Sequence, residues 1–291
     1  MGFDLRYFLF FLFSLIFCFA IWSLLVFGQS KNPSKMSQWI YDVYEKKIDS
    51  LKKIKEQKIL IVAGSNAMFG VDSKILSKAF DMKVFNFGVN AGIELPLTLY
   101  LAQRAINSGD IVIMPLEYSM YSYDGKMGVQ MIDYLVSRQR EFFLNLSFQE
   151  KLYLLWKIDL ISVIDGYFDK SNSKDEAGLY GYINIDETGA HIGSVLKYRL
   201  DVYFNSISTK PENYADEFNK DNLSWRYLEE FVIWCEKRDV KVYFMPPSLM
   251  KNEQYFQADR WYYENLEKVM SQKGFNFVGN PFEYMYDKEY Y

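Results

Sequence analysis

The sequence predicts an α/β protein with a parallel sheet and one N-terminal transmembrane helix. After Lys58, a continuous apolar run rich in β-branched residues at 59–63 is typical of a strand that is buried on both faces. Strand-like and helix-like segments then alternate, which indicates right-handed crossovers and a three-layer, flavodoxin-like sheet with helices on both faces. With 291 residues and 50% hydrophobic content, the chain is long enough to bury one large core.

The first segment of the chain is the predicted membrane anchor, residues 1–30. No charged residue occurs from Tyr7 to Phe27, and such a run is long enough to cross a hydrocarbon core of about 30 Å. The main alternative is a cleaved signal peptide, but the run exceeds the usual apolar length of roughly 7–15 residues. We therefore expect a single-pass protein of the cell membrane, in contact with the lipid bilayer.

The charges that flank the anchor give a weak signal for its orientation. Arg6 precedes the apolar run, and four lysines follow it: Lys31, Lys35, Lys46 and Lys47. Counted directly, these charges favour a cytoplasmic main domain, although large domains also translocate against a weak charge bias.

Residues 31–57 are predicted to form a polar linker and a stalk helix. Apolar residues recur at helical spacing from Met36 to Ile54. After the first strand, Asp72 or Ser73 can cap a helix that continues to Phe80. The next predicted elements are a strand at Lys83–Phe87, a helix at Ile93–Asn107 and a strand at Asp110–Pro115.

The middle of the chain, about residues 119–220, interrupts this alternation and is predicted to be an internal helical insertion. It contains two helical patterns, Val129–Phe143 and Phe148–Ile164, followed by a polar stretch. The predicted domain therefore covers residues 58–291 and includes this insertion. The alternation resumes with a helix at Asn222–Lys237, a strand at Val240–Met245, a helix at Gln254–Gln272 and a strand at Phe275–Val278.

Ser65 is the candidate nucleophile because it follows the first strand directly. Ligands of open parallel sheets bind outside the carboxyl ends of the strands, where a serine would be presented to them. The alternative is a purely structural role in a tight strand-to-helix turn, since Gly64, Ser65 and Asn66 are all favoured in turns for backbone reasons.

Two segments resemble the SGNH/GDSL hydrolase superfamily, in particular its membrane-anchored branch that includes the D-alanyl-lipoteichoic acid biosynthesis proteins. Ser65 is followed by Gly70 five positions on, as in the family's first block, and Asn86-Phe87-Gly88-Val89-Asn90 is similar to the second. The resemblance covers roughly residues 58–118 and 240–291. It implies that Ser65 attacks an ester carbonyl and that the amides of Ser65 and Gly88 stabilise the oxyanion.

The third and last blocks of the family pattern differ in this chain. Glu117 stands where the family carries Gly-x-Asn-Asp, so Asn66 or Asn90 would supply a third donor, or the site lacks it. The final Asp-x-x-His, which holds the general base, is missing: Asp287 is followed by Tyr290, as though the chain were truncated just short of the base. His191 has acidic neighbours that can orient an imidazole, but a lone loop histidine is more often inert.

The resemblance implies an esterase or O-acyltransferase that acts on cell-envelope polysaccharide from the periplasmic or extracellular side, with an acyl donor protein as a partner. Without its base block, such a site is expected to be incomplete or inactive. The alternative is a non-catalytic protein with a degenerate SGNH fold that binds an envelope glycan or a membrane partner. A third reading, a cytoplasm-facing nucleotide-sugar enzyme, lacks any phosphate-binding motif.

Composition narrows the expected ligands further. One histidine and no close cysteine pair predict no metal site, and no cofactor motif is present. Positive residues are dispersed and the net charge is −4, so we expect no nucleic-acid partner.

Overall fold

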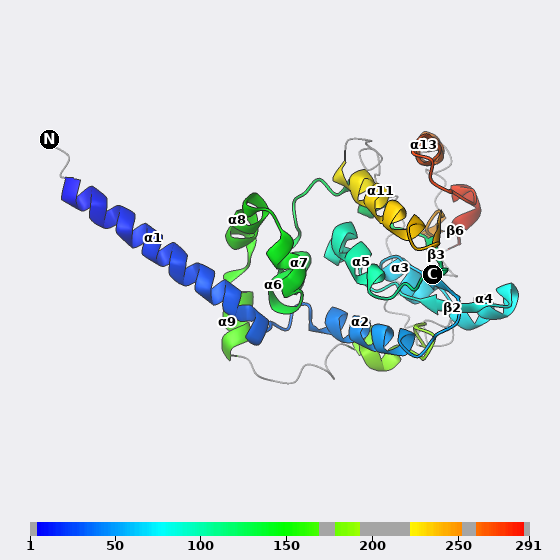
Figure 1. Cartoon of the computed structure of the whole chain (residues 1–291), viewed down its shortest axis with the longest axis horizontal. Helices are drawn as coiled ribbons and strands as arrows, with labels where there is room; N and C mark the ends of the chain where they lie inside the picture. Colours follow the sequence, from blue (N-terminus) through cyan, green and yellow to red (C-terminus); the bar gives the residue numbers. More distant parts are fainter. Residues whose placement is uncertain (1–4, 169–177, 193–221, 252–259, 288–291) are drawn as a thin grey trace. The chain divides into compact units, whose positions relative to one another are not determined.

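The structure is a computed structural model that describes residues 5–168, 178–192, 222–251 and 260–287 (Figure 1). The chain forms two compact units, which are described separately. The first contains residues 5–41 and 127–168, and the second contains the other described residues. The domain boundaries expected from the sequence stay a prediction, and residues 193–221 of the expected insertion lie outside the described residues.

The regular elements of the first unit are all helices within its described residues. Its longest element is α1 (Leu5–Gly28), which is long and apolar enough to cross a membrane and in which only Val26 is buried. At about 1.5 Å per residue, its 24 residues extend about 36 Å. The remaining elements are η1 (Gln29–Lys31), the start of α2 (Gln38–Leu51), α6 (Val129–Arg138), α7 (Arg140–Asn145), α8 (Phe148–Lys157) and α9 (Leu160–Phe168).

Each of the two helices expected in the insertion is divided in the structure. Gln139 leaves the helical region, with φ −124° and ψ 62°, and separates α6 from α7. Between α8 and α9, the Asp159 carboxylate accepts from the Ser162 amide (2.9 Å) at the start of the new helix. A side-chain cap therefore interrupts the second apolar pattern at Asp159, whereas the break at Gln139 has no side-chain cap hydrogen bond.

The second unit contains the predicted parallel sheet. Its strands are β1 (Lys58–Ile61), β2 (Lys83–Asn86), β3 (Ile111–Met114) and β4 (Lys241–Phe244), in the order β2-β1-β3-β4. All three pairings are parallel, which confirms the expected mixed α/β architecture. The order equals that of the first four strands of a flavodoxin-like sheet. Phe277 pairs with Phe244 through a single parallel bridge at the position of the last expected strand.

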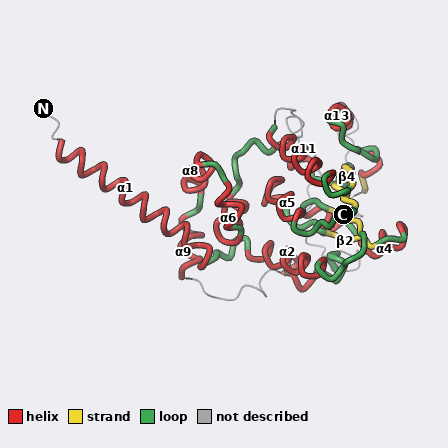
Figure 2. Tube along the Cα trace, in the orientation of Figure 1, coloured by secondary structure: helices red, strands yellow, loops and turns green. Residues whose placement is uncertain are grey.

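Helices lie around this sheet (Figure 2). The Asp72 side chain caps α4, as expected, by accepting from the amides of Lys74 (2.8 Å) and Ile75 (3.1 Å). Helices α5 and α11 contact each other. The helical elements of this unit are α3 (Ser65–Gly70), α4 (Ser73–Phe80), η2 (Ala91–Ile93), α5 (Glu94–Gln103), η3 (Tyr118–Ser122), η5 (Gly178–Tyr180), η6 (Tyr182–Asn184), α11 (Leu223–Glu236), α13 (Arg260–Gln272) and η8 (Pro281–Tyr284). A second, two-stranded sheet pairs β5 (Leu249–Met250) with β6 (Met285–Tyr286).

The core of the sheet includes one ion pair. Lys58 begins β1 and its ammonium group lies 2.5 Å from the carboxylate of Asp110, with both side chains fully buried. The same carboxylate accepts from the amides of Asn107 (2.7 Å) and Lys58 (3.2 Å). Asp110 therefore connects Lys58, at the start of β1, with Asn107, in the loop before β3.

Candidate functional site

The candidate site lies at the topological switch point of the sheet, where the order of the strands reverses. β2 pairs with one edge of β1 and β3 with the other, so the chain crosses over β1 between β2 and β3. In open α/β sheets, this arrangement leaves a crevice at the carboxyl ends of the two central strands. The Gly64–Asn66 turn follows β1, and Glu117 follows β3. The fold therefore brings two candidate segments from the sequence to the same place.

Glu117 bridges the two amides that flank Ser65. The Gly64 N–H donates to Oε2 of Glu117 (2.9 Å), and the Asn66 N–H donates to Oε1 (3.0 Å). Burial raises the pKa of this carboxyl group, while hydrogen bonding from the amides of Asn66, Gly64 and Ser65 acts against the rise. Consecutive amides that converge on one anion form an anion-binding nest. The group bound in this nest is the Glu117 side chain of the same protein and not a ligand.

Two glycines permit the close packing of the nest. A Cβ atom on Gly64 would lie 2.4 Å from Oε1 of Glu117 and 2.7 Å from the amide nitrogen of Ala91. A Cβ atom on Gly88 would lie 2.7 Å from the Gly64 carbonyl oxygen. A side chain at either position would displace backbone, so glycine is required where the loops after β1 and β2 meet.

Gly88 has hydrogen-bond partners on both of its backbone groups. Its N–H, the expected second oxyanion donor, donates to Oδ1 of Asn86 (3.0 Å). Its carbonyl accepts from the ammonium group of Lys47 (2.5 Å). Asn86 in turn donates to the carbonyls of Ala67 (2.6 Å) and Val71 (3.1 Å), which ties the loop to α3.

Lys47 is a functional candidate that the sequence reasoning missed. It is completely buried, and this burial lowers its pKa to about 7, with the charge of Asp186 acting in the opposite direction. The sequence carries a signal for it, because Lys47 falls on the apolar side of the stalk helix with Tyr44 and Leu51. We counted it only among the charges that flank the anchor.

The other expected donors are placed differently. The Ser65 side chain is half-buried and makes no hydrogen bond to any described residue. Asn66 donates its side-chain amide to the Pro115 carbonyl (2.7 Å) and so joins the turns after β1 and β3. Oδ1 of Asn90 is buried and has no partner within the described part of the chain.

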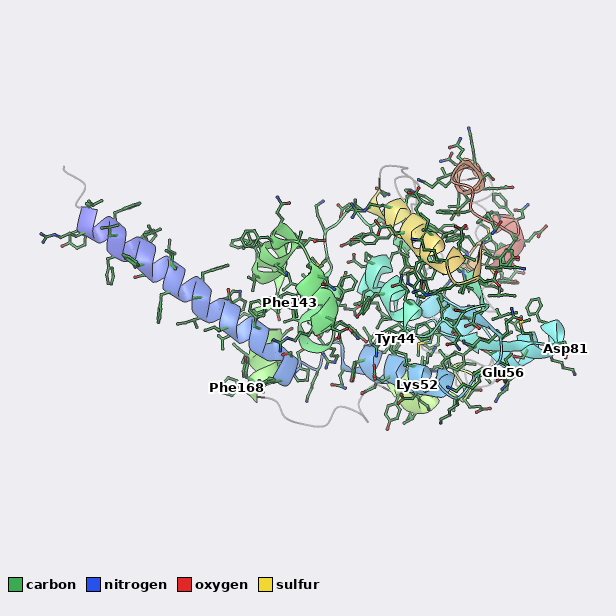
Figure 3. All side chains as sticks on the ribbon, in the orientation of Figure 1. Tyr44, Lys52, Glu56, Asp81, Phe143 and Phe168 are labelled. Carbon is green, nitrogen blue, oxygen red and sulfur yellow. The ribbon has the colours of Figure 1, made fainter. Side chains whose placement is uncertain are left out.

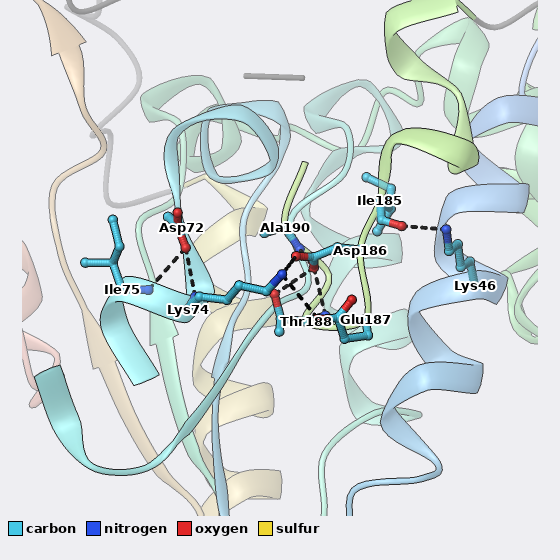
Figure 4. Close-up of polar contacts among 9 residues, drawn as sticks. All are labelled: Lys46, Asp72, Lys74, Ile75, Ile185, Asp186, Glu187, Thr188 and Ala190. Atoms are coloured by element: carbon cyan, nitrogen blue, oxygen red, sulfur yellow. Dashed lines mark hydrogen bonds and ion pairs between the residues drawn. The ribbon is translucent and has the colours of Figure 1, made fainter. Parts of the chain in front are cut away.

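His191 packs beside α3 in a folded loop. Its Nε2 lies 2.7 Å from the Leu179 carbonyl, its ring meets that of Phe69 edge-on at 4.8 Å, and burial lowers its pKa. Asp186 organises this loop by accepting from Thr188 (2.8 Å from its amide) and by pairing with Lys74 (2.9 Å; Figure 4). The imidazole is thus near the candidate helix but makes no hydrogen bond to Ser65.

The C-terminal block lies at the limit of the described chain. Asp287 pairs with Lys251 at 3.6 Å, whereas Tyr290, at the expected histidine position, lies outside the described residues.

A cavity of about 280 Å³ lies next to Ala91. Because the Ala91 amide approaches Gly64, the cavity adjoins the nest that holds Glu117. At its rim, Glu94 adopts φ 60° and ψ 167°, a backbone conformation that non-glycine residues rarely adopt and that clusters at functional sites. The lining residues are Ala91, Glu94, Leu95, Ser119, Met120, Ser122, Tyr123, Asp124 and Lys126.

Comparisons with known proteins give no assignment for this site. No protein-family model, curated protein or solved structure matches the chain. Within the described residues, no group of three or more His, Cys, Asp or Glu side chains is arranged to hold a metal ion.

Proposed function

We propose that this protein is a membrane-anchored, SGNH-like protein of the cell envelope that binds an envelope glycan without hydrolysing it. In this proposal α1 is an uncleaved single-pass anchor, and the α/β unit lies on the periplasmic or extracellular side. The observation that carries the proposal is the bridge from Glu117 to the amides of Gly64 and Asn66.

The bridge matters because an oxyanion hole has to offer its donors to the charge that develops on the substrate. The amides around Ser65 are already directed at a carboxylate, and the Gly88 N–H is directed at Asn86. Acyl transfer at Ser65 would require these bonds to break and would leave a buried carboxylate without its donors, which is costly. A fixed turn of this kind suits a rigid binding site better than turnover.

The cavity beside the nest supplies the binding groups for a glycan. Ser119, Ser122 and Glu94 present hydroxyl and carboxylate groups that can hydrogen-bond to sugar hydroxyls, next to the aromatic ring of Tyr123. Its volume, about 280 Å³, is just below the usual range of roughly 300–1,000 Å³ for ligand pockets. We therefore expect it to accept the end of a glycan and not an internal segment.

The binding test uses full-length protein in detergent and N-acetylchitotetraose as a soluble probe for N-acetylated envelope glycan. Ser119→Trp places a large ring in the cavity, and Ser271→Trp introduces the same ring at an exposed position on α13. We expect saturation-transfer NMR signals for the wild type and Ser271→Trp, and at least about a tenfold loss of affinity for Ser119→Trp. Equal binding by all three proteins, or by none, would contradict the proposed glycan site.

A second candidate function is an SGNH esterase or O-acyltransferase, which the placement of Ser65 favours. Ser65 follows β1 at the topological switch point of the sheet, and its hydroxyl is not hydrogen-bonded to any described residue. Such an enzyme would form a bond from Ser65 Oγ to the acyl carbon and break the ester C–O bond, and a base would pass the serine proton to the oxygen of the departing alcohol.

A fluorophosphonate probe separates the two functions. For a non-hydrolytic protein, we expect no adduct on Ser65 under conditions that label a serine hydrolase in the same sample. An adduct that disappears in Ser65→Ala and persists in the matched Ser119→Ala variant would instead establish a reactive serine and favour the enzyme.

A further inference from the structure

The first unit exposes an apolar stripe along α8. The stripe is formed by Phe148, Leu152 and Trp156, which are spaced four residues apart and therefore lie on one face of the helix. Phe148 is 74% exposed and Trp156 is 85% exposed, whereas Leu154 and Leu155 of the same helix are buried. The helix therefore has apolar residues on its buried and its exposed sides.

Helix α9 repeats this pattern. Its exposed apolar residues are Leu160 (56%), Ile161 (66%), Ile164 (45%) and Phe168 (83%), the last of which is labelled at the end of α9 in Figure 3. Large apolar patches are rarely exposed in soluble proteins, and where they occur they mark interaction sites with proteins or membranes. We call these residues of α8 and α9 together the α8–α9 apolar face.

Both helices are attached to the C-terminal end of α1. The indole N–H of Trp22 donates to the Leu155 carbonyl (2.7 Å), and the Tyr167 hydroxyl donates to the Leu25 carbonyl (2.9 Å). Gln29, just beyond α1, donates to the Val163 carbonyl (2.9 Å) from a buried position. These bonds fix α8 and α9 to α1 within the same unit.

The attachment points determine the depth of the two helices if α1 spans a bilayer. Trp22 and Leu25 belong to the uncharged run that ends at Phe27. With a rise of about 1.5 Å per residue, Trp22 lies only about 8 Å inside the end of that run. Elements that bond to α1 at this level are therefore at the boundary between acyl chains and headgroups.

We propose that α8 and α9 lie in the membrane interface and that the α8–α9 apolar face contacts the acyl chains of the bilayer that α1 crosses. Interfacial helices bury their apolar side about 5–10 Å into this boundary, which matches the level of Trp22 and Leu25. The exposed Trp156 suits this region, because tryptophan is enriched at both membrane interfaces. The bilayer is chosen as the occupant because both helices that carry the α8–α9 apolar face are hydrogen-bonded to the apolar helix α1 or to the residue just beyond it.

The test measures the environment of the α8–α9 apolar face in full-length protein reconstituted into phosphatidylcholine–phosphatidylglycerol vesicles. In a Cys18→Ala background, Ile161→Cys and Phe168→Cys are made separately and labelled with an environment-sensitive fluorophore; Cys235 is buried in the folded protein. Ile75→Cys on α4 is the matched control, because Ile75 is an apolar residue that is 68% exposed. Circular dichroism checks folding, and two separate positions keep the test valid should one variant misfold.

We expect a nitroxide-labelled lipid to quench the labels at positions 161 and 168 at least about threefold more than a water-soluble quencher does, and the reverse at position 75. Efficient quenching from water at positions 161 and 168 would overturn the proposal. Protection from both quenchers, together with energy transfer between labelled copies, would also overturn it and would assign the α8–α9 apolar face to a second copy of the chain.

Discussion

Replacing Glu117 with glutamine exchanges one carboxylate oxygen in the nest for an NH₂ group. The two carboxylate oxygens accept from different amides, at 2.9 Å from Gly64 and 3.0 Å from Asn66. Glutamine keeps one acceptor and turns an NH₂ group toward the other amide, so one buried N–H loses its partner, at a cost of about 1–3 kcal/mol. Removing a buried charge offsets part of this cost. We therefore expect the Glu117→Gln variant to lose about 1–2 kcal/mol of unfolding free energy at neutral pH.

The pH dependence of this loss has a definite sign. Burial raises the pKa of Glu117 in the folded protein above its ordinary value of 4.5. At pH values between the unfolded and the folded pKa, the folded state therefore binds more protons than the unfolded state. The contribution of Glu117 is fully present below about pH 4.5 and declines as the pH rises through the folded pKa. The free-energy difference between the wild type and Glu117→Gln should therefore shrink as the pH increases.

The assay is urea unfolding of the full-length protein in detergent, with hydrogen exchange of peptides from residues 58–70 and 110–118 reporting on the second unit. Glu187→Gln is the matched control, since the Glu187 side chain is 77% exposed and its replacement should change stability by less than about 0.5 kcal/mol. A Glu117→Gln variant as stable as the control would refute the assignment of Glu117 as the occupant of the nest. A difference that grows with pH would instead contradict the raised pKa of Glu117.

Three further substitutions test other parts of the second unit. Lys47→Met removes a group whose pKa falls from 10.5 to about 7 on folding, so wild-type stability relative to this variant should rise between pH 7 and 10; parallel pH curves in urea unfolding would contradict this. Asp110→Asn should cost about 3–5 kcal/mol by leaving Lys58 unpaired, and the double variant Lys58→Met, Asp110→Asn should recover part of that loss; an equally unstable double variant would count against the ion pair. Asp72→Ala should cost about 1 kcal/mol and speed hydrogen exchange in the first turn of α4, whereas unchanged exchange there would argue against the cap.

The sequence predicted the sheet well because the signals involved are local. The strand at residues 58–61 follows from a run of apolar residues, and the Asp72 cap follows from one carboxylate before an amphipathic helix. The divisions at Gln139 and Asp159 were missed because the apolar spacing continues across both breaks. At Asp159, a carboxylate three residues before Ser162 was a capping signal that the apolar pattern concealed.

The site was predictable only in part, because its decisive contacts join segments that are distant in the sequence. Position after a strand placed Ser65 and Glu117 in neighbouring turns, but no local pattern indicates that a carboxylate 51 residues away accepts from the Asn66 amide. The burial of Lys47 likewise depends on the Gly88 carbonyl, which lies 41 residues further along the chain. Such pairs become visible only when the strand order is known.

The buried pair of Lys58 and Asp110 also bears on how the sheet selects its alignment. A slip of β3 by one residue along β1 would reverse the side of every β3 side chain and separate the two charges inside an apolar core. Isoleucine and valine alone would distinguish poorly between neighbouring alignments, since each alternative still buries apolar groups. In any other register the ammonium and carboxylate groups would be buried without each other, which raises the free energy of that register. The contact therefore selects one register for β1 and β3, the strands that precede Ser65 and Glu117.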